Sequence, residues 1–252
     1  MIKVSNLNIS FGENVVLNGV DLEVPNGSTI VVLGRSGIGK SVLLKCLVRL
    51  IEPDTGQIEI DGKSVLNLKI KELNELRKEI GFLFQSAALY DSMNVEENLA
   101  FPLKRHTELS DKEIKTRIIE MLDMVGLQEA LKKMPTELSG GMKKRIGFAR
   151  SLILYPKIML YDEPTTGLDP VTSKEITRLI LKMQERFKMT SVVVTHDMIC
   201  ALSVADQIVM LEDGKFMFKG STNELIKSSD VFLKNFLSTN LENYPKDPSE
   251  RR

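Results

Sequence analysis

The segment STIVVLGRSGIGKS, residues 28–41, constrains the fold more than any other part of the chain. It opens with a short continuous apolar run, which is typical of a strand buried on both faces of a parallel sheet. It continues into GRSGIGKS, residues 34–41, which matches the pattern G-x-x-x-x-G-K-[ST], and a helix is expected from Gly39 to about Leu50. Four specified positions match by chance roughly once in 100 chains of this length. The segment therefore predicts a phosphate-binding loop between a buried strand and a helix.

The residue types in this loop are those that bind a nucleotide and its metal ion. Glycines let backbone N–H groups close around a phosphate without a side-chain clash. Lys40 is expected to reach the β- and γ-phosphates of ATP, and Ser41 to place its hydroxyl on Mg²⁺. The predicted nucleotide-binding residues of the loop are Gly34, Arg35, Ser36, Gly37, Ile38, Gly39, Lys40 and Ser41.

A second apolar run, IMLYDE at 158–163, ends in two carboxylates. It places Asp162 and Glu163 at the carboxyl end of a predicted strand, where ligands bind in open α/β sheets. Asp162 is expected to bind Mg²⁺, and Glu163 to polarise a water molecule aimed at the γ-phosphate. The alternative is an Asp-Glu pair that simply opens a loop, and the phosphate loop upstream disfavours it.

Strands and helices alternate along most of the chain, and this predicts a mostly parallel α/β sheet of the P-loop NTPase (RecA-like) type. We expect an N-terminal antiparallel β subdomain and a helical subdomain inserted at about 85–155. The main domain is expected to cover residues 1–236, and a polar C-terminal tail residues 237–252. The predicted strands are 2–10, 15–24, 28–33, 57–62, 81–84, 157–163 and 190–196, and the predicted helices beyond the phosphate loop are 110–124, 141–154 and 172–187.

Composition excludes several classes of protein. Lys plus Arg equals Asp plus Glu at 34 each, so the formal net charge is zero, which argues against a nucleic-acid partner. The chain shows no apolar core of a signal peptide and no stretch of the roughly 18 apolar residues needed to cross a bilayer. Cys46 and Cys200 fit no metal-binding spacing and are predicted to be small core residues in a reducing compartment. Any membrane role is therefore expected to come through a partner.

The segment LSGGM, residues 138–142, has the residues of a second anion-binding helix start. Ser139, Gly140 and Gly141 offer a hydroxyl and backbone N–H groups but no charge. Alone, the segment is best interpreted as a helix N-cap made by Ser139. The two uses are compatible, because the donors at a capped helix start are also the donors offered to a phosphate.

These motifs, in this order, resemble the nucleotide-binding subunit of an ATP-binding cassette (ABC) transporter. The resemblance spans residue 1 to about 225 and rests on GRSGIGKS, Gln85, LSGGM, IMLYDE, GLDP at 167–170 and THD at 195–197. The family implies an ATPase in which two copies pack head to tail. LSGGM of one copy then caps the ATP held by the phosphate loop of the other. The second anion-binding helix start thus completes a site that the two copies share.

The resemblance implies further roles residue by residue. Phe11 matches the aromatic residue that stacks on adenine, with Val16 beside it, although a lone Phe after a strand is more often a core residue. Gln85 matches the glutamine that senses Mg²⁺ and the attacking water. His196 matches the switch histidine that contacts the γ-phosphate, whereas a lone His after a buried strand is more often structural. The other histidine, His106, has no motif and is predicted to lie on the surface.

Asp169, in GLDP, matches the loop that crosses the dimer axis in the family. The alternative is a turn before a helix with Pro170 at its first position. The implied catalytic residues are then Lys40, Gln85, Glu163 and His196, and the implied Mg²⁺ ligands are Ser41, Gln85 and Asp162.

Residues 84–110, FQSAALYDSMNVEENLAFPLKRHTELS, resemble one branch of the family, the Mla-type ATPases of lipid-transport systems with MCE-type substrate-binding proteins. Met142 in place of glutamine and Ile38 in the phosphate loop fit that branch, whereas the basic KRH at 104–106 departs from it. The branch implies phospholipid transport, with a permease and an MCE-type lipid-binding protein as partners. It implies a peripheral position on the cytoplasmic face of the bacterial inner membrane.

Apolar residues in this stretch have two interpretations: a groove for a short helix of a partner, or the core of the helical subdomain itself. They are Leu89, Tyr90, Met93, Phe101, Pro102 and Leu103. Near the C-terminus, residues 231–245 extend beyond the minimal cassette, and the branch implies a tail that embraces the neighbouring subunit. One predicted helical edge there carries Val231, Phe232, Asn235 and Phe236.

Three alternative functions fit the sequence less well. A polar amino-acid importer has a similar cassette, but residues 84–110 and Met142 disfavour it. A soluble ABC protein acting on ribosomes or DNA usually has two cassettes or a long coiled-coil insertion, and this sequence shows neither. A P-loop kinase or GTPase is excluded by LSGGM.

Overall fold

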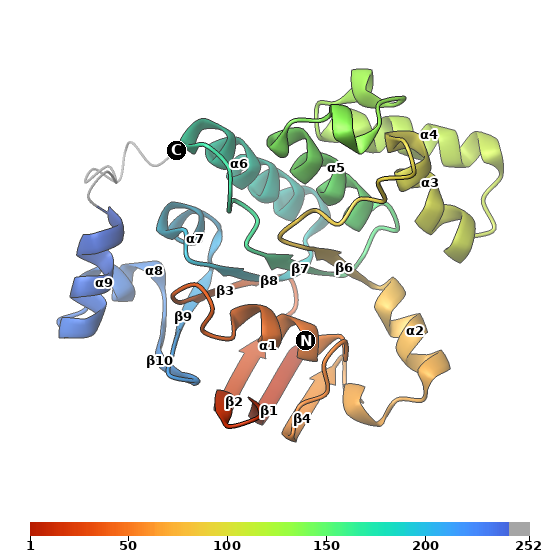
Figure 1. Cartoon of the computed structure of the whole chain (residues 1–252). Coiled ribbons are helices and arrows are strands. Elements are labelled where there is room, and N and C mark those ends of the chain that lie inside the picture. Colours follow the sequence, from red (N-terminus) through yellow and green to blue (C-terminus); the bar gives the residue numbers. More distant parts are fainter. Residues whose placement is uncertain (242–252) are drawn as a thin grey trace. The chain divides into compact units, whose positions relative to one another are not determined.

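A computed structural model describes residues 1–241, which fall into two compact units (Figure 1). The first unit contains residues 1–68 and the chain from Thr190 onward, and the second contains residues 69–189. Most of the predicted tail, 237–252, lies outside the described residues.

The first unit contains an antiparallel sheet with strand order β2-β1-β4-β5. Its strands are β1 (Ile2–Phe11), β2 (Asn14–Val24), β4 (Thr55–Ile60) and β5 (Lys63–Ser64). Ile2 pairs with Val24 across β1 and β2 and with Ile60 across β1 and β4. All three side chains are buried, because alternate residues of these strands point to one covered face. The predicted N-terminal antiparallel subdomain is confirmed.

The first unit also carries the strand that leads into the phosphate loop. Strand β3 (Thr29–Leu33) lies parallel between β8 (Thr190–Thr195) and β9 (Gln207–Glu212), and β10 (Lys215–Gly220) is antiparallel to β9. Every residue of β3 and β8 is buried, as continuous apolar runs predict. The helices of this unit are α1 (Lys40–Leu47), α7 (Met198–Val204), α8 (Thr222–Lys227) and α9 (Val231–Leu241), and a 3-10 turn covers Val65–Asn67.

In the second unit, β6 (Ile80–Leu83) pairs in parallel with β7 (Ile158–Asp162). Helices α3, α4 and α5 contact one another and form the predicted helical subdomain (Figure 1). The helices of this unit are α2 (Ile70–Lys78), α3 (Val95–His106), α4 (Asp111–Met124), α5 (Gly140–Leu152) and α6 (Pro170–Phe187), with 3-10 turns at Gln128–Ala130 and Pro135–Glu137.

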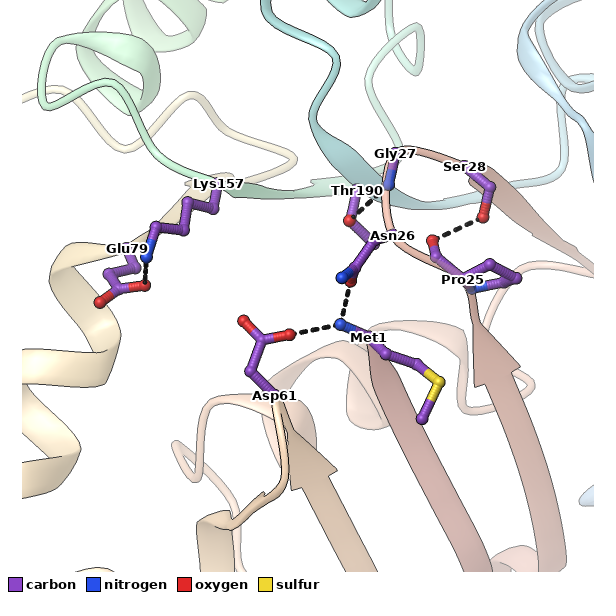
Figure 2. Close-up of polar contacts among 9 residues, drawn as sticks. All are labelled: Met1, Pro25, Asn26, Gly27, Ser28, Asp61, Glu79, Lys157 and Thr190. Carbon is purple, nitrogen blue, oxygen red and sulfur yellow. Dashed lines mark hydrogen bonds and ion pairs between the residues drawn. The ribbon is translucent and has the colours of Figure 1, made fainter.

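Polar contacts fix several strand ends, and Figure 2 shows them. The turn after β2 is held by the backbone N–H of Gly27, which donates to Thr190 Oγ1 at 2.9 Å. The α-amino group of Met1 contacts the side chains of Asn26 and Asp61. In the second unit, Lys157 Nζ pairs with the Glu79 carboxylate at 2.7 Å, just ahead of β7 and β6.

Predicted elements around the motifs are confirmed, but α2, α3, α7, α8, β5, β9 and β10 were not predicted. Helix α3 contains Pro102, a residue that normally breaks helices because it has no N–H to donate. It forms nevertheless, since Asn94 and Glu97 cap its start reciprocally. Helix α1 is shorter than predicted and ends at Leu47, and Arg49 then turns left-handed with φ 50°.

Helix α9 has one buried face. Val231 is 72% exposed and Asn235 is exposed, whereas Leu233, Phe236 and Leu237 are buried. The buried residues follow the i, i+3, i+4 spacing of one helix face, and α9 contacts α7. Of the predicted edge, Val231 and Asn235 are thus exposed, Phe232 is half-buried and Phe236 is buried.

Both cysteines lie in helices of the first unit and are buried free thiols, as predicted. Within residues 1–241, no helix combines the length and the apolar character needed to cross a bilayer.

Candidate functional site

The phosphate loop of the first unit has glycine at positions that admit no side chain. A Cβ at Gly34 would lie 2.7 Å from the carbonyl oxygen of Leu211, and one at Gly39 2.6 Å from Val16 Cγ1. Gly37 and Gly39 also adopt φ angles of 82° and 109°, which other residues rarely adopt. Close packing and backbone conformation together explain why the loop is glycine-rich.

Lys40 is folded into this loop. It is 4% exposed, and its Nζ donates hydrogen bonds of 2.8 Å to the carbonyl oxygens of Gly34 and Arg35. These bonds curl the loop around the ammonium group at the start of α1. Because the N-cap residue is Gly39, no side chain covers the first turn of that helix. The loop thus presents a cation and a helix N-terminus together, which is an anion-binding arrangement.

The aromatic residue Phe11 is exposed and does not belong to the core. It is the last residue of β1, pairs with Asn14 across the hairpin and is 52% exposed. The core interpretation of Phe11 is therefore wrong. Val16 is half-buried and packs against Gly39, so β2 lies beside the phosphate loop.

His196 lies at the same sheet edge as the phosphate loop. Leu33 and Thr195 are register partners in the parallel pair β3–β8, and the loop and His196 begin immediately after them. His196 is exposed, and the helix that follows is capped by Asp197, whose carboxylate accepts from the N–H groups of Ile199 and Cys200. His196 is thus accessible at the edge where the phosphate loop begins.

In the second unit, Gln85 and the two carboxylates also share a sheet edge. Leu83 and Tyr161 are register partners in the parallel pair β6–β7. Gln85 follows two residues after Leu83 and is exposed, and Asp162 ends β7. The strand ends thus bring Gln85 to the edge where Asp162 and Glu163 lie.

Glu163 is held at both ends in an unusual conformation. It is 6% exposed and its φ of 48° is in the left-handed region. Thr166 Oγ1 donates to Glu163 Oε2 at 3.0 Å, and Lys144 Nζ donates to the Glu163 carbonyl oxygen at 3.0 Å. Non-glycine residues with positive φ often mark sites where function requires a fixed side-chain orientation.

Lys144, from α5, is a buried cation to which sequence reasoning assigned no role. It is 5% exposed, and burial lowers its pKa from 10.5 to about 8, although the charges of Asp162 and Glu163 act in the opposite direction. One signal in the sequence points to its burial: Lys144, Phe148 and Leu152 follow the i, i+4, i+8 spacing of one helix face.

The segment LSGGM begins α5 as predicted, with Ser139 at the N-cap. Its hydroxyl accepts from the backbone N–H of Met142 at 3.2 Å. Ser139 and Gly140 are exposed, whereas a Cβ at Gly141 would lie 2.6 Å from Thr172 Cγ2 of α6. Gly141 therefore has a packing role that the motif alone does not reveal.

Asp169 caps α6, with Pro170 at the first helical position. Its carboxylate accepts from the backbone N–H groups of Val171 and Thr172 at 3.0 and 3.1 Å. Hydrogen bonds from the side chain and then the backbone of Thr172 hold the pKa of Asp169 below its usual value. The predicted helix-start geometry is confirmed.

The loop that follows Gln85 is fixed by two residues that sequence reasoning also missed. Ala87 and Ala88 adopt φ angles of 61° and 49°, and Arg150 Nη2 donates to both of their carbonyl oxygens, at 3.2 and 2.8 Å. Asn98 is fully buried, and its amide bonds both the N–H and the carbonyl of Tyr90.

A groove of about 260 Å³ opens beside this loop. Of the predicted partner-contacting residues, Tyr90, Phe101 and Pro102 line it, whereas Leu103 is fully buried in the helical subdomain. The core interpretation is therefore correct for Leu103, whereas partner binding by the residues that line the groove stays a prediction. His106 is exposed at the groove as predicted, and partial burial and the charges of Lys78 and Arg105 lower its pKa.

Comparison with known proteins gives the context for this geometry. The family model described as "ABC transporter" matches residues 17–166. The chain is 38% identical to the intermembrane phospholipid transport system ATP-binding protein MlaF of Haemophilus influenzae, over 94% of this chain and 90% of that protein. It is 42% identical to the probable ribonucleotide transport ATP-binding protein mkl of Mycobacterium leprae, over 94% of this chain and 68% of that protein.

Among solved structures, the ATP-binding cassette MJ0796, a dimer in a post-hydrolysis state bound to ADP and Pi, superposes with a TM-score of 0.81. It is 33% identical, and the match covers 88% of this chain and 99% of that one. The predicted fold class is thereby confirmed: an α/β P-loop cassette with a mostly parallel sheet and an N-terminal antiparallel sheet. The chain therefore belongs to the ABC transporter family and is its ATP-binding ATPase subunit.

Proposed function

We propose that this ATPase powers phospholipid transport at the bacterial inner membrane. The observation that carries the proposal is the 38% identity to an intermembrane phospholipid transport ATPase over 90% of that protein's length. Residues 84–110 add support, since they resemble the Mla-type branch and supply Tyr90, Phe101 and Pro102 to the groove. The relative named for ribonucleotide transport makes a nucleotide cargo the second candidate.

The working unit in this proposal is a head-to-tail dimer with two ATP molecules at its interface. Ser139 and Gly140 are exposed at the start of α5 and carry donors but no cation, whereas Lys40 supplies a cation in the phosphate loop. The two features complement one another across two copies. The dimeric cassette bound to ADP and Pi has the same fold and supports this arrangement.

Hydrolysis in this proposal is assigned to the predicted site residues. The hydroxyl of Ser41, the amide oxygen of Gln85 and the carboxylate of Asp162 are hard oxygen donors of the type that Mg²⁺ prefers, so the residues fit that ion. When bound, Mg²⁺ neutralises charge on the phosphates. Glu163 acts as the general base toward the attacking water, and Lys40 and His196 hold the γ-phosphate. Phe11 stacks on the adenine, and Val16 lies beside it.

The partners are a membrane permease, which docks in the groove, and an MCE-type lipid-binding protein. This places the ATPase peripherally on the cytoplasmic face of the membrane. We also propose that the tail, 237–252, embraces the neighbouring subunit. Deleting residues 238–252 is then expected to weaken dimerisation with ATP and assembly of the complex, whereas unchanged assembly by size-exclusion chromatography would contradict this role.

The cargo is tested by purifying the tagged ATPase from membranes, identifying its partners by mass spectrometry and reconstituting the complex in proteoliposomes. We expect a permease and an MCE protein to copurify, and fluorescent phospholipid to move only with ATP. The Glu163→Gln complex is the matched control. ATP-dependent movement of a ribonucleotide instead of phospholipid would favour the second candidate, and recovery of ribosomes or an amino-acid-binding protein would end the proposal.

A further inference from the structure

The buried ammonium of Lys144 is the feature of the second unit that the proposed mechanism does not use. Burying a charged group is costly unless hydrogen bonds replace its water. Lys144 Nζ donates at 3.0 Å to the backbone carbonyl of Glu163, 19 residues away. The neighbouring Lys143 on the same helix is only half-buried. The buried lysine is therefore aimed at one specific acceptor.

The acceptor is the backbone carbonyl of Glu163, the residue whose side-chain orientation matters most for hydrolysis in the proposed mechanism. A left-handed conformation at a non-glycine residue such as Glu163 is strained and persists only where its surroundings enforce it. The turn is closed by the Thr166 N–H, which also donates to the Glu163 carbonyl, at 3.3 Å. Lys144 supplies the second donor to that oxygen, and Thr166 Oγ1 anchors the carboxylate at the other end.

The geometry points to Lys144 as a positioning residue for ATP hydrolysis, which holds the Glu163 backbone so that its carboxylate faces the attacking water. This inference rests on the proposed role of Glu163 as the base. Lys144 lies five residues after Ser139 on the same helix. The helix that offers its N-terminus to one ATP molecule thereby also fixes the base that acts on the other.

The test compares three substitutions in the complex purified from membranes. Lys144→Met removes the donor, Lys144→Arg keeps a charged donor, and Lys143→Met is the matched control on the same helix. We expect Lys144→Met to lower kcat by about 10- to 100-fold, with the Kd for a fluorescent ATP analogue changed by less than about 3-fold. Lys144→Arg should restore part of kcat, and Lys143→Met should behave as wild type.

A double-mutant cycle separates positioning from a general effect on folding. In a Glu163→Gln background, Lys144→Met should reduce kcat little further, because the residue through which it acts is already lost. The inference is overturned if Lys144→Met turns over within 2-fold of wild type, or if its losses in kcat add fully to those of Glu163→Gln. If Lys144→Met does not fold, the Lys144→Arg and Lys144→Gln cycles decide in the same way. High activity of Glu163→Gln alone would instead refute the assigned base.

Discussion

Arg150 and Asn98 are 52 residues apart in the chain, yet Arg150 Nη1 donates a hydrogen bond to Asn98 Oδ1 at 3.2 Å. Asn98 also donates to the carbonyl oxygens of Tyr90 and Met93, at 3.1 and 2.9 Å. One buried amide thus joins α3, α5 and the loop that begins at Gln85. The loop runs from the predicted Mg²⁺-sensing residue to the groove, which Arg150 itself lines, so its shape is set by side chains of α3 and α5.

Asn98→Ala is expected to lower the free energy of unfolding by about 2–4 kcal/mol, because it removes a fully buried side chain that bonds both the N–H and the carbonyl of Tyr90. Urea denaturation followed by circular dichroism measures the change. Asn74→Ala, at an exposed position of α2, is the control and should stay within about 0.5 kcal/mol of wild type. Equal effects of the two substitutions would show that the hydrogen bonds of Asn98 do not contribute to the free energy of unfolding.

Glu163→Gln should slow ATP hydrolysis by roughly 10²- to 10⁴-fold while ATP still binds, because the amide keeps the shape of the side chain but is not a base. Single-turnover hydrolysis and equilibrium binding of a fluorescent ATP analogue measure the two effects separately. Substitution of the exposed Glu185 by Gln, on α6, serves as the control. Near-normal single-site turnover in Glu163→Gln would remove this residue from the mechanism.

The depressed pKa of Lys144 gives the stability a defined pH dependence. In the folded protein Lys144 loses its proton near pH 8, whereas its ordinary value is 10.5. Between these values the unfolded chain binds more protons, so the contribution of Lys144 to stability rises with pH. The unfolding free energy of wild type minus that of Lys144→Met should therefore increase from pH 7 to pH 10. Urea titrations without nucleotide test this, and a flat or falling difference is the contrary result.

Both thiols should be unreactive in the folded protein. Cys46 and Cys200 are buried, and burial raises the pKa of Cys46 to about 12, so little thiolate forms at pH 8. Titration with a chromogenic disulfide reagent at pH 8 should release almost no colour until denaturant is added, and then two equivalents. Fast reaction of either thiol under native conditions would show that α1 or α7 opens readily.

The phosphate loop, the Asp-Glu strand and the capped helix starts were predictable, because each depends on residues that are neighbours in sequence. Lys144 and Asn98 were not assigned, since their importance comes from acceptors that only the folded chain brings within reach. Helix α3 was missed because Pro102 signals a break, while its capping box at Asn94 favours a start. The exposure of Phe11 also depends on which parts of the folded chain cover the end of its hairpin, and sequence periodicity does not predict that.

The contact between Gly141 and Thr172 makes the two glycines of LSGGM unequal as experimental probes. A methyl group at Gly141 would collide with α6, whereas one at Gly140 would meet only Leu168 Cδ2, at 3.6 Å. A loss of activity in Gly141→Ala therefore mixes a shifted helix with any lost phosphate contact. Gly140→Ala tests the phosphate contact cleanly, and a relative with a larger residue at the second glycine is expected to carry a smaller one in place of Thr172.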